Sequence, residues 1–148
     1  MCLLARDDRN SRVTLELLTQ QGQNRVVVQR YLPEARRGDH RVLIINGEVV
    51  GSILRTPQED DHRGNIHVGG KVTHLPLNVE ERALCDRVAR QLQRDGIFFA
   101  GLDLIGGKLT EINITSPTGI RELKTLTGMD AGELLIDAIE QRLLERRT

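Results

Sequence analysis

Three oxygen-bearing side chains interrupt two apolar runs in the last third of this 148-residue chain. Asp103 lies in the run LDLI, and Glu111 and Asn113 lie in the run LTEINI. Both runs have the composition of β-strands, so the segment 101–118 predicts a hairpin in which Glu111 and Asn113 share one face. Burying an ionised carboxylate is costly, and a bound cation would offset that cost. Carboxylate and amide oxygens suit Mg²⁺.

The length of the hairpin loop decides whether the two carboxylates converge. A two-residue loop, Gly106-Gly107, would pair Asp103 with Thr110 and leave Asp103 and Glu111 on opposite faces. An odd-numbered loop centred on Gly107 pairs Asp103 with Glu111, and we predict this loop. The alternative is that the polar residues only mark the solvent-facing side of an antiparallel sheet.

A second predicted hairpin carries two arginines. The run RVLIINGEVVGSILR contains Asn46-Gly47, a strong hairpin signal, with Arg41 and Arg55 at its ends. The planar guanidinium fork matches a pair of carboxylate or phosphate oxygens, although arginines at hairpin ends can also simply be solvated. In the polar stretch 56–74 that follows, backbone N–H groups of Gly69 and Gly70 could approach an anion. The histidines of this stretch have no recurrent zinc spacing; they are His62, His67 and His74.

The remaining elements predict an α/β (α+β) fold with an antiparallel sheet of five or six strands. We expect a buried strand at Arg25–Gln29 and helices over 12–21, 79–95 and 131–146. The two long helices should pack on one face of the sheet. Ser11, Asn78 and Asp130 are the predicted N-caps, with Glu81 completing a capping box. The predicted buried stripe of helix 79–95 is Val79, Ala83, Leu84, Val88 and Leu92, with Cys85 beside it as a core residue.

Composition narrows the class of protein. The chain has 39% apolar residues, and its 21 basic and 21 acidic residues give a formal net charge of zero. This balance argues against general nucleic-acid binding. Two cysteines do not make a disulfide framework, and the sequence has neither a membrane-span nor a signal-peptide pattern. We therefore expect a cytoplasmic domain that binds no membrane.

The motifs together resemble a known family. The pattern D-x-x-G-x-x-x-x-E-I-N followed by T-S-P-T resembles the metal-binding end of ATP-grasp ligases. Upstream lie V-V-Q-R-Y-L-P, G-D-H-R-V-L and R-G-N-I-H-V-G-G, in the order found in bacterial glutathione synthetases. From about Arg25 to the C-terminus, the chain is similar to the C-terminal part of the ATP-grasp domain of that family.

The resemblance implies ATP-dependent ligation of glycine to γ-glutamylcysteine through an acyl phosphate, which gives glutathione. It implies that Mg²⁺ (or Mn²⁺) is held by Asp103, Glu111 and Asn113, and that Arg41 is catalytic. It implies ATP contacts from Gln29, Arg30, Tyr31, Leu32 and Asp39. The substrate contacts that it implies are Arg41, Arg55, Arg63, Gly69, Gly70, Ser116 and Thr118.

The lysines suggest that the resemblance covers part of an enzyme. The family holds the nucleotide phosphates with two upstream lysines and a lid loop, whereas the lysines here are Lys71, Lys108 and Lys124. We therefore expect residues 1–148 to be a single partial ATP-grasp domain, the C-terminal lobe, without the lid lobe and the N-terminal substrate domain. It would be inactive alone and need those lobes, for example as a separate chain; homo-oligomers are known among full-length relatives. The alternatives are a non-catalytic nucleotide- or metal-binding module and a different ATP-grasp carboxylate–amine ligase.

Overall fold

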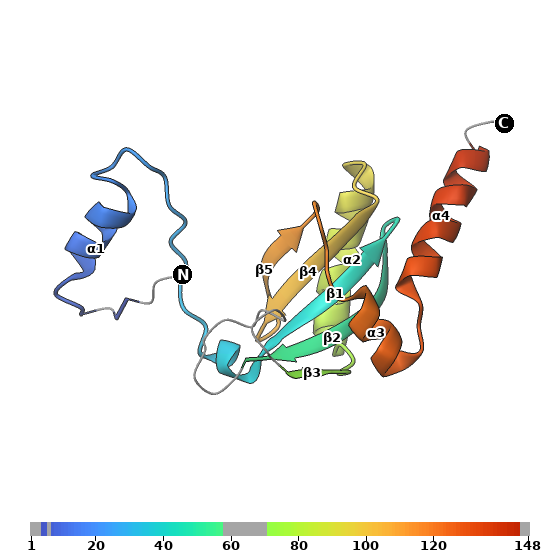
Figure 1. Ribbon diagram of the computed structural model, residues 1–148, viewed down its shortest axis with the longest axis horizontal. Coiled ribbons are helices and arrows are strands. Elements are labelled where there is room, and N and C mark those ends of the chain that lie inside the picture. Colours follow the sequence, from blue (N-terminus) through green and yellow to red (C-terminus); the bar gives the residue numbers. More distant parts are fainter. Residues whose placement is uncertain (1–3, 6, 58–70, 146–148) are drawn as a thin grey trace. The chain divides into compact units, whose positions relative to one another are not determined.

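The computed structural model describes residues 4–5, 7–57 and 71–145 (Figure 1). The chain forms two units, Met1–Leu32 and Pro33–Thr148. In the described part of the second unit, antiparallel strands form one five-stranded sheet in the order β3-β2-β1-β4-β5. The strands are β1 (Asp39–Ile45), β2 (Glu48–Thr56), β3 (Lys71–Thr73), β4 (Phe99–Ile105) and β5 (Lys108–Asn113). The predicted α/β class with an antiparallel sheet is confirmed.

The β1–β2 hairpin turns at Asn46-Gly47, as predicted. Both turn residues have positive φ, 48° and 83°, as a two-residue type I′ turn requires. The register then shifts by one residue, because Leu43 pairs with Gly51 while the next residue, Ile44, pairs with Val49. Val50 is thus the extra residue of a β-bulge. The shift brings Asp39 opposite Arg55 at the far end of the hairpin.

The β4–β5 hairpin corrects one prediction and confirms another. Its loop is the two-residue turn Gly106-Gly107, with φ values of 55° and 73°, so the predicted odd-numbered loop is wrong. A bulge at Thr110 changes the register, and Asp103 still pairs with Glu111, as predicted. The Thr110 hydroxyl donates a hydrogen bond of 3.0 Å to the Asp103 carbonyl and closes the bulge.

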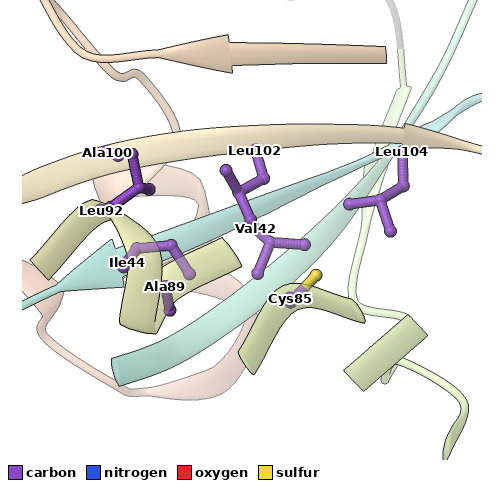
Figure 2. Close-up of a cluster of buried hydrophobic side chains, with 8 residues drawn as sticks. All are labelled: Val42, Ile44, Cys85, Ala89, Leu92, Ala100, Leu102 and Leu104. Atoms are coloured by element: carbon purple, nitrogen blue, oxygen red, sulfur yellow. The ribbon is translucent and has the colours of Figure 1, made fainter. Parts of the chain in front are cut away.

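Two apolar cores lie on opposite faces of the sheet. Helix α2 (Val79–Arg94) covers one face. The core between this helix and the sheet is shown in Figure 2, and its buried residues are Val42, Ile44, Cys85, Ala89, Leu92, Ala100, Leu102 and Leu104. Helices α3 (Ile120–Thr127) and α4 (Ala131–Glu145) pack on the other face, against Leu43, Ile45 and Ile53. Neighbouring residues of β1 therefore point to different helices. The prediction that both long helices share one face is wrong.

Helix α2 begins with the predicted capping box, in which Asn78 and Glu81 exchange side-chain-to-backbone hydrogen bonds. Its buried face is rotated from the predicted stripe, because Val79 is 86% exposed and Ala83 is also exposed. Cys85 is fully buried, as expected of a core residue. Burial raises the pKa of the Cys85 thiol to about 11, so the thiol is protonated at neutral pH. The residues that the helix buries are Glu81, Cys85, Ala89 and Leu92.

Helix α4 is capped as predicted, since the Asp130 carboxylate accepts hydrogen bonds from the backbone N–H groups of Gly132 and Glu133. A short 3₁₀ helix, η1 (Pro33–Arg37), precedes β1. Among the described residues, no helix combines the length and the apolar content needed to cross a membrane.

The first unit contains α1 (Ser11–Leu18), which ends three residues before the predicted boundary. Asn10, not Ser11, occupies its N-cap and makes no side-chain capping bond. The segment 25–29 is not a strand, and Val27 and Val28 are 86% and 75% exposed. A β-branched run becomes a strand only where its backbone groups find a partner, and no described segment pairs with this one. The predicted buried strand is therefore wrong.

Candidate active site

Four charged side chains converge on the face of the sheet that also carries α3 and α4. Side-chain alternation places Asp39 and Arg41 of β1 on this face. The cross-strand partner of Asp39 is Arg55 of β2, and that of Arg41 is Asp103 of β4. All four residues are buried, with exposed fractions between 4% and 9%. We call these four residues the arginine–aspartate cluster.

The charges in the cluster alternate along a continuous chain of contacts. Arg41 binds Asp103 with its guanidinium fork, through Nε to Oδ1 at 2.6 Å and Nη2 to Oδ2 at 2.9 Å. Arg55 reaches the same Oδ2 through Nη2 at 2.9 Å. Arg55 also donates from Nε to Asp39 Oδ2 at 3.0 Å and makes a second, short contact to that oxygen through Nη2. Asp103 therefore holds both arginines, and Asp39 holds Arg55.

Arg41 has a second anchor on the loop after β5. Its Nη1 donates to the carbonyl and to the hydroxyl oxygen of Thr118, each at 3.1 Å. Two glycines give its aliphatic stem room, because a Cβ at Gly101 or Gly119 would lie 3.3 Å from Arg41 side-chain carbons. Gly119 also has φ of 116°, a backbone conformation that favours glycine. The guanidinium position is thus fixed by Asp103 on one side and by Thr118 on the other.

Burial and pairing act on the ionisation of the cluster. Burial raises the pKa of the Asp39 carboxyl, and this effect outweighs the hydrogen bond and attraction from Arg55. Burial also lowers the pKa of Arg55, but its contacts with Asp39 and Asp103 outweigh burial and leave that pKa above its ordinary value. Arg55 is therefore a permanent cation in a largely dry environment.

Of the three predicted metal ligands, Asp103 belongs to the cluster, and the other two lie beside it on the same face. Glu111 is opposite Asp103, and Asn113 is opposite Gly101 one pleat further along β5. Glu111 is exposed, and its side chain makes no hydrogen bond or ion pair with the described residues. Asn113 Oδ1 accepts hydrogen bonds from the backbone N–H groups of Thr115 and Ser116, at 3.3 and 3.2 Å. Within the described ranges no three His, Cys, Asp or Glu side chains form a metal cage.

The other predicted site residues are spread over the chain. Ser116 is exposed on the loop after β5, close in sequence to Thr118. The expected hinge residues lie in the first unit, in extended backbone; Gln29, Arg30 and Tyr31 are exposed and Leu32 is half-buried. The expected substrate contacts Arg63, Gly69 and Gly70 fall outside the described residues, as do His62 and His67.

Sequence reasoning missed the pairing inside the cluster. Asp39 was expected at the nucleotide, yet its carboxylate is engaged by Arg55. The alternation in D-H-R would have placed Asp39 and Arg41 on one face, but the bulge that adds Arg55 to that face has no local signal.

On the opposite face, His40 Nδ1 lies 3.5 Å from Glu81 Oε1 at the start of α2. His40 Nε2 is buried without a hydrogen-bond partner in the described part of the chain.

Comparisons with known proteins give consistent similarities. Residues 1–128 match the family model described as prokaryotic glutathione synthetase, ATP-grasp domain. A glutathione synthetase of Synechococcus elongatus is 50% identical over 133 residues, which are 90% of this chain and 41% of the relative. One of Agrobacterium fabrum is 46% identical over 138 residues, 93% of this chain and 43% of the relative. The chain thus spans about two fifths of the length of these relatives.

One solved structure shares the fold. A structure of the ATP-grasp ligase PsnB complexed with minimal precursor superposes with a TM-score of 0.51 at 17% sequence identity. The superposition covers 86% of this chain and 42% of the other. At this identity the likeness concerns the fold alone.

Proposed function

The chain belongs to the family of the prokaryotic glutathione synthetase ATP-grasp domain, and from this we propose that it supplies the metal and arginine contacts of a glutathione synthetase. The reaction we assign to the whole enzyme joins γ-glutamylcysteine to glycine at the expense of ATP. Because the matched part is about two fifths of each relative, the remaining contacts are assigned to the rest of the enzyme. The observation that carries the proposal is the buried arginine–aspartate cluster with Glu111 beside it on the same face.

The donor set fits Mg²⁺ (or Mn²⁺). Asp103, Glu111 and Asn113 offer only hard oxygen ligands, which these ions prefer, and lie on one face of one hairpin. Nucleotide phosphates and water would complete the coordination, as is usual for Mg²⁺. When bound, the cation would neutralise phosphate charge. The Glu111 carboxylate is more accessible to a cation than that of Asp103, because it is exposed and pairs with no side chain among the described residues.

Arg41 and Arg55 provide fixed positive charge for the reaction. In the reaction we assign, the substrate carboxylate attacks the γ-phosphorus of ATP, ADP leaves and an acyl phosphate forms. The glycine amine then attacks the carbonyl carbon, and the C–O bond to phosphate breaks. Both steps develop negative charge on oxygen, which preorganised guanidinium groups stabilise in a dry site. Arg41 is assigned to the reacting carboxylate and the transferred phosphate, with Arg55 beside it.

The other contacts remain assignments by family. We assign ATP binding to Gln29, Arg30, Tyr31, Leu32 and Asp39. Substrate binding is assigned to Arg63, Gly69, Gly70, Ser116 and Thr118, in addition to the two arginines. We also place the enzyme in the cytoplasm, where the free thiol of Cys85 stays reduced, and include homo-oligomers among its partners.

Calorimetric titration with ATP, with and without Mg²⁺, tests the metal assignment. We expect magnesium-dependent binding by the wild-type chain that is lost in Glu111→Ala. Glu140→Ala, which removes an exposed carboxylate from α4, is the matched control and should bind like the wild type. Magnesium-dependent binding that survives in Glu111→Ala would refute the ligand assignment. No ATP binding by the wild type would refute a half-site formed by this chain alone.

A further inference from the structure

Asp103 has two roles that compete for the same carboxylate. The proposed function places a divalent cation on it, yet both of its oxygens already accept guanidinium N–H groups. We propose that Asp103 exchanges partners: when the cation binds, Arg41 and Arg55 are released to an anionic ligand. This inference rests on the proposed function and adds a consequence, which is that cation and anion bind cooperatively.

The geometry shows what Asp103 replaces. Arg41 presents Nε and Nη2, the edge of the guanidinium that binds a carboxylate or a phosphate through two parallel hydrogen bonds. Asp103 occupies this edge and therefore stands where the oxygens of an anionic ligand would lie. An external carboxylate or phosphate group must displace Asp103 before it can use the same fork.

Each arginine keeps another hydrogen-bond partner when its hydrogen bonds to Asp103 are broken. Arg41 is held through Nη1 by the carbonyl and hydroxyl oxygens of Thr118, and Arg55 is held through Nε by Asp39. Neither anchor involves Asp103. The exchange therefore requires only a change of hydrogen-bond partners, and both guanidinium groups stay in position for the incoming anion.

Charge balance links the two ligands. The cluster and Glu111 together contain three carboxylates and two guanidinium groups, which leave one negative charge in excess. A cation alone would add two positive charges next to two guanidinium groups, and an anion alone would add negative charge next to three carboxylates. The cation alone would change the net charge from one negative to one positive, and the anion alone would increase the negative excess, so each ion on its own leaves repulsion that is strong where the dielectric constant is low. Added together, the ions compensate each other, so each must raise the affinity for the other by the same factor.

The first test measures this coupling on the wild-type chain. Inorganic phosphate is titrated calorimetrically into the full 148-residue chain without Mg²⁺ and at saturating Mg²⁺. We expect Mg²⁺ to lower the Kd for phosphate by about fivefold or more, the lower range of coupling between ligand sites. A Kd that does not change would overturn the exchange.

Variants separate the two roles of Asp103. Asp103→Asn removes the charge that holds the arginines, so we expect tighter phosphate binding without Mg²⁺ and no further gain on adding it. Glu111→Gln should abolish the magnesium effect without the gain seen in Asp103→Asn. Asp137→Asn, which removes one exposed charge on α4, should show the wild-type coupling. If Asp103→Asn folds, as judged by circular dichroism, and binds phosphate no more tightly, the exchange is wrong.

The outcomes distinguish this inference from the proposed function. Failure of Mg²⁺ to bind the wild-type chain at all would overturn both. If Mg²⁺ binds and Glu111→Gln abolishes its binding, while the Kd for phosphate does not respond to Mg²⁺, only the exchange is overturned. Should Asp103→Asn not fold, the wild-type ratio of the two Kd values decides the question by itself.

Discussion

At the scale of single residues, the site depends on charges that are buried and fully paired. Removing one partner of a buried ion pair leaves an uncompensated charge and typically costs about 3–5 kcal/mol. The cost should be largest for Asp103, because it is the one carboxylate that both arginines contact. The glycines around the stem of Arg41 then decide whether its guanidinium can reach Asp103 and Thr118 together.

The first prediction concerns the space that Gly119 leaves for Arg41. An added methyl group would meet Ile53 at 3.2 Å and Arg41 at 3.3 Å, whereas at Gly128 it would meet nothing within 4 Å. Both glycines have positive φ, so each change to alanine should cost roughly 1–2 kcal/mol in backbone strain. Crowding should add about 1–3 kcal/mol in Gly119→Ala only. Urea denaturation measures both, and equal losses would contradict the crowding.

At the scale of elements, two β-bulges decide which side chains share the site. Each hairpin has a two-residue turn followed by one extra residue, Val50 in the first and Thr110 in the second. If these residues were paired in a regular ladder instead of being bulged, Arg55 and Glu111 would each move by one position in the pairing and point to the other face of the sheet. The bulge in the first hairpin therefore brings Arg55 to the charged face, and the bulge in the second brings Glu111 there.

The second prediction concerns the boundary at which α2 begins. The Asn78 side chain accepts a hydrogen bond from the Glu81 N–H at 2.9 Å, so Asn78→Ala should lower the free energy of unfolding by about 1 kcal/mol. Asn10 stands at the N-cap of α1 but makes no side-chain capping bond, and Asn10→Ala is the matched control with little expected effect. Thermal denaturation followed by circular dichroism compares the two variants. A loss as large in Asn10→Ala would argue against the capping bond as the cause.

At the scale of the whole molecule, one sheet separates two cores and carries the site at one end of one face. The α2 core and the core of α3 and α4 are both made of residues from the second unit. The arginine–aspartate cluster continues the second core along β1 and β4, where apolar side chains give way to charged ones. The same strands thus stabilise the fold and position the charges.

The third prediction follows from this division of the chain. Residues 33–148 contain both cores and every described strand, so they should fold without residues 1–32. We expect a cooperative thermal transition for the shorter chain, with a Tm within about 5 °C of that of the full chain. In a domain of this size a change of about 1 kcal/mol in the free energy of unfolding moves Tm by several degrees, and removing residues 1–32 should change that free energy by no more than this. A broad, non-cooperative transition would show that the first unit contributes to the core.

The sequence by itself determined the features that depend on near neighbours. The Asn46-Gly47 turn, the capping box of Asn78 and Glu81, and the ordered motifs that mark the family were all predicted correctly, because each depends on a few adjacent residues. The pairing of Asp103 with Glu111 was also predicted, although through the wrong loop. In that case a bulge and an odd-numbered loop have the same effect on the register.

Only the tertiary structure decided which distant groups meet. The contacts of Asp103 with Arg41 and Arg55 join residues of three strands, and the contact with Arg55 depends on a bulge that carries no local signal. The placement of α2 and α4 on opposite faces was equally hidden, since an apolar helix face fits either side of a sheet that is buried on both. The run of valines at 26–28 became no strand, because strand formation requires a partner and is not a property of the run itself. Long-range pairing therefore converted a set of scattered charges into the arginine–aspartate cluster.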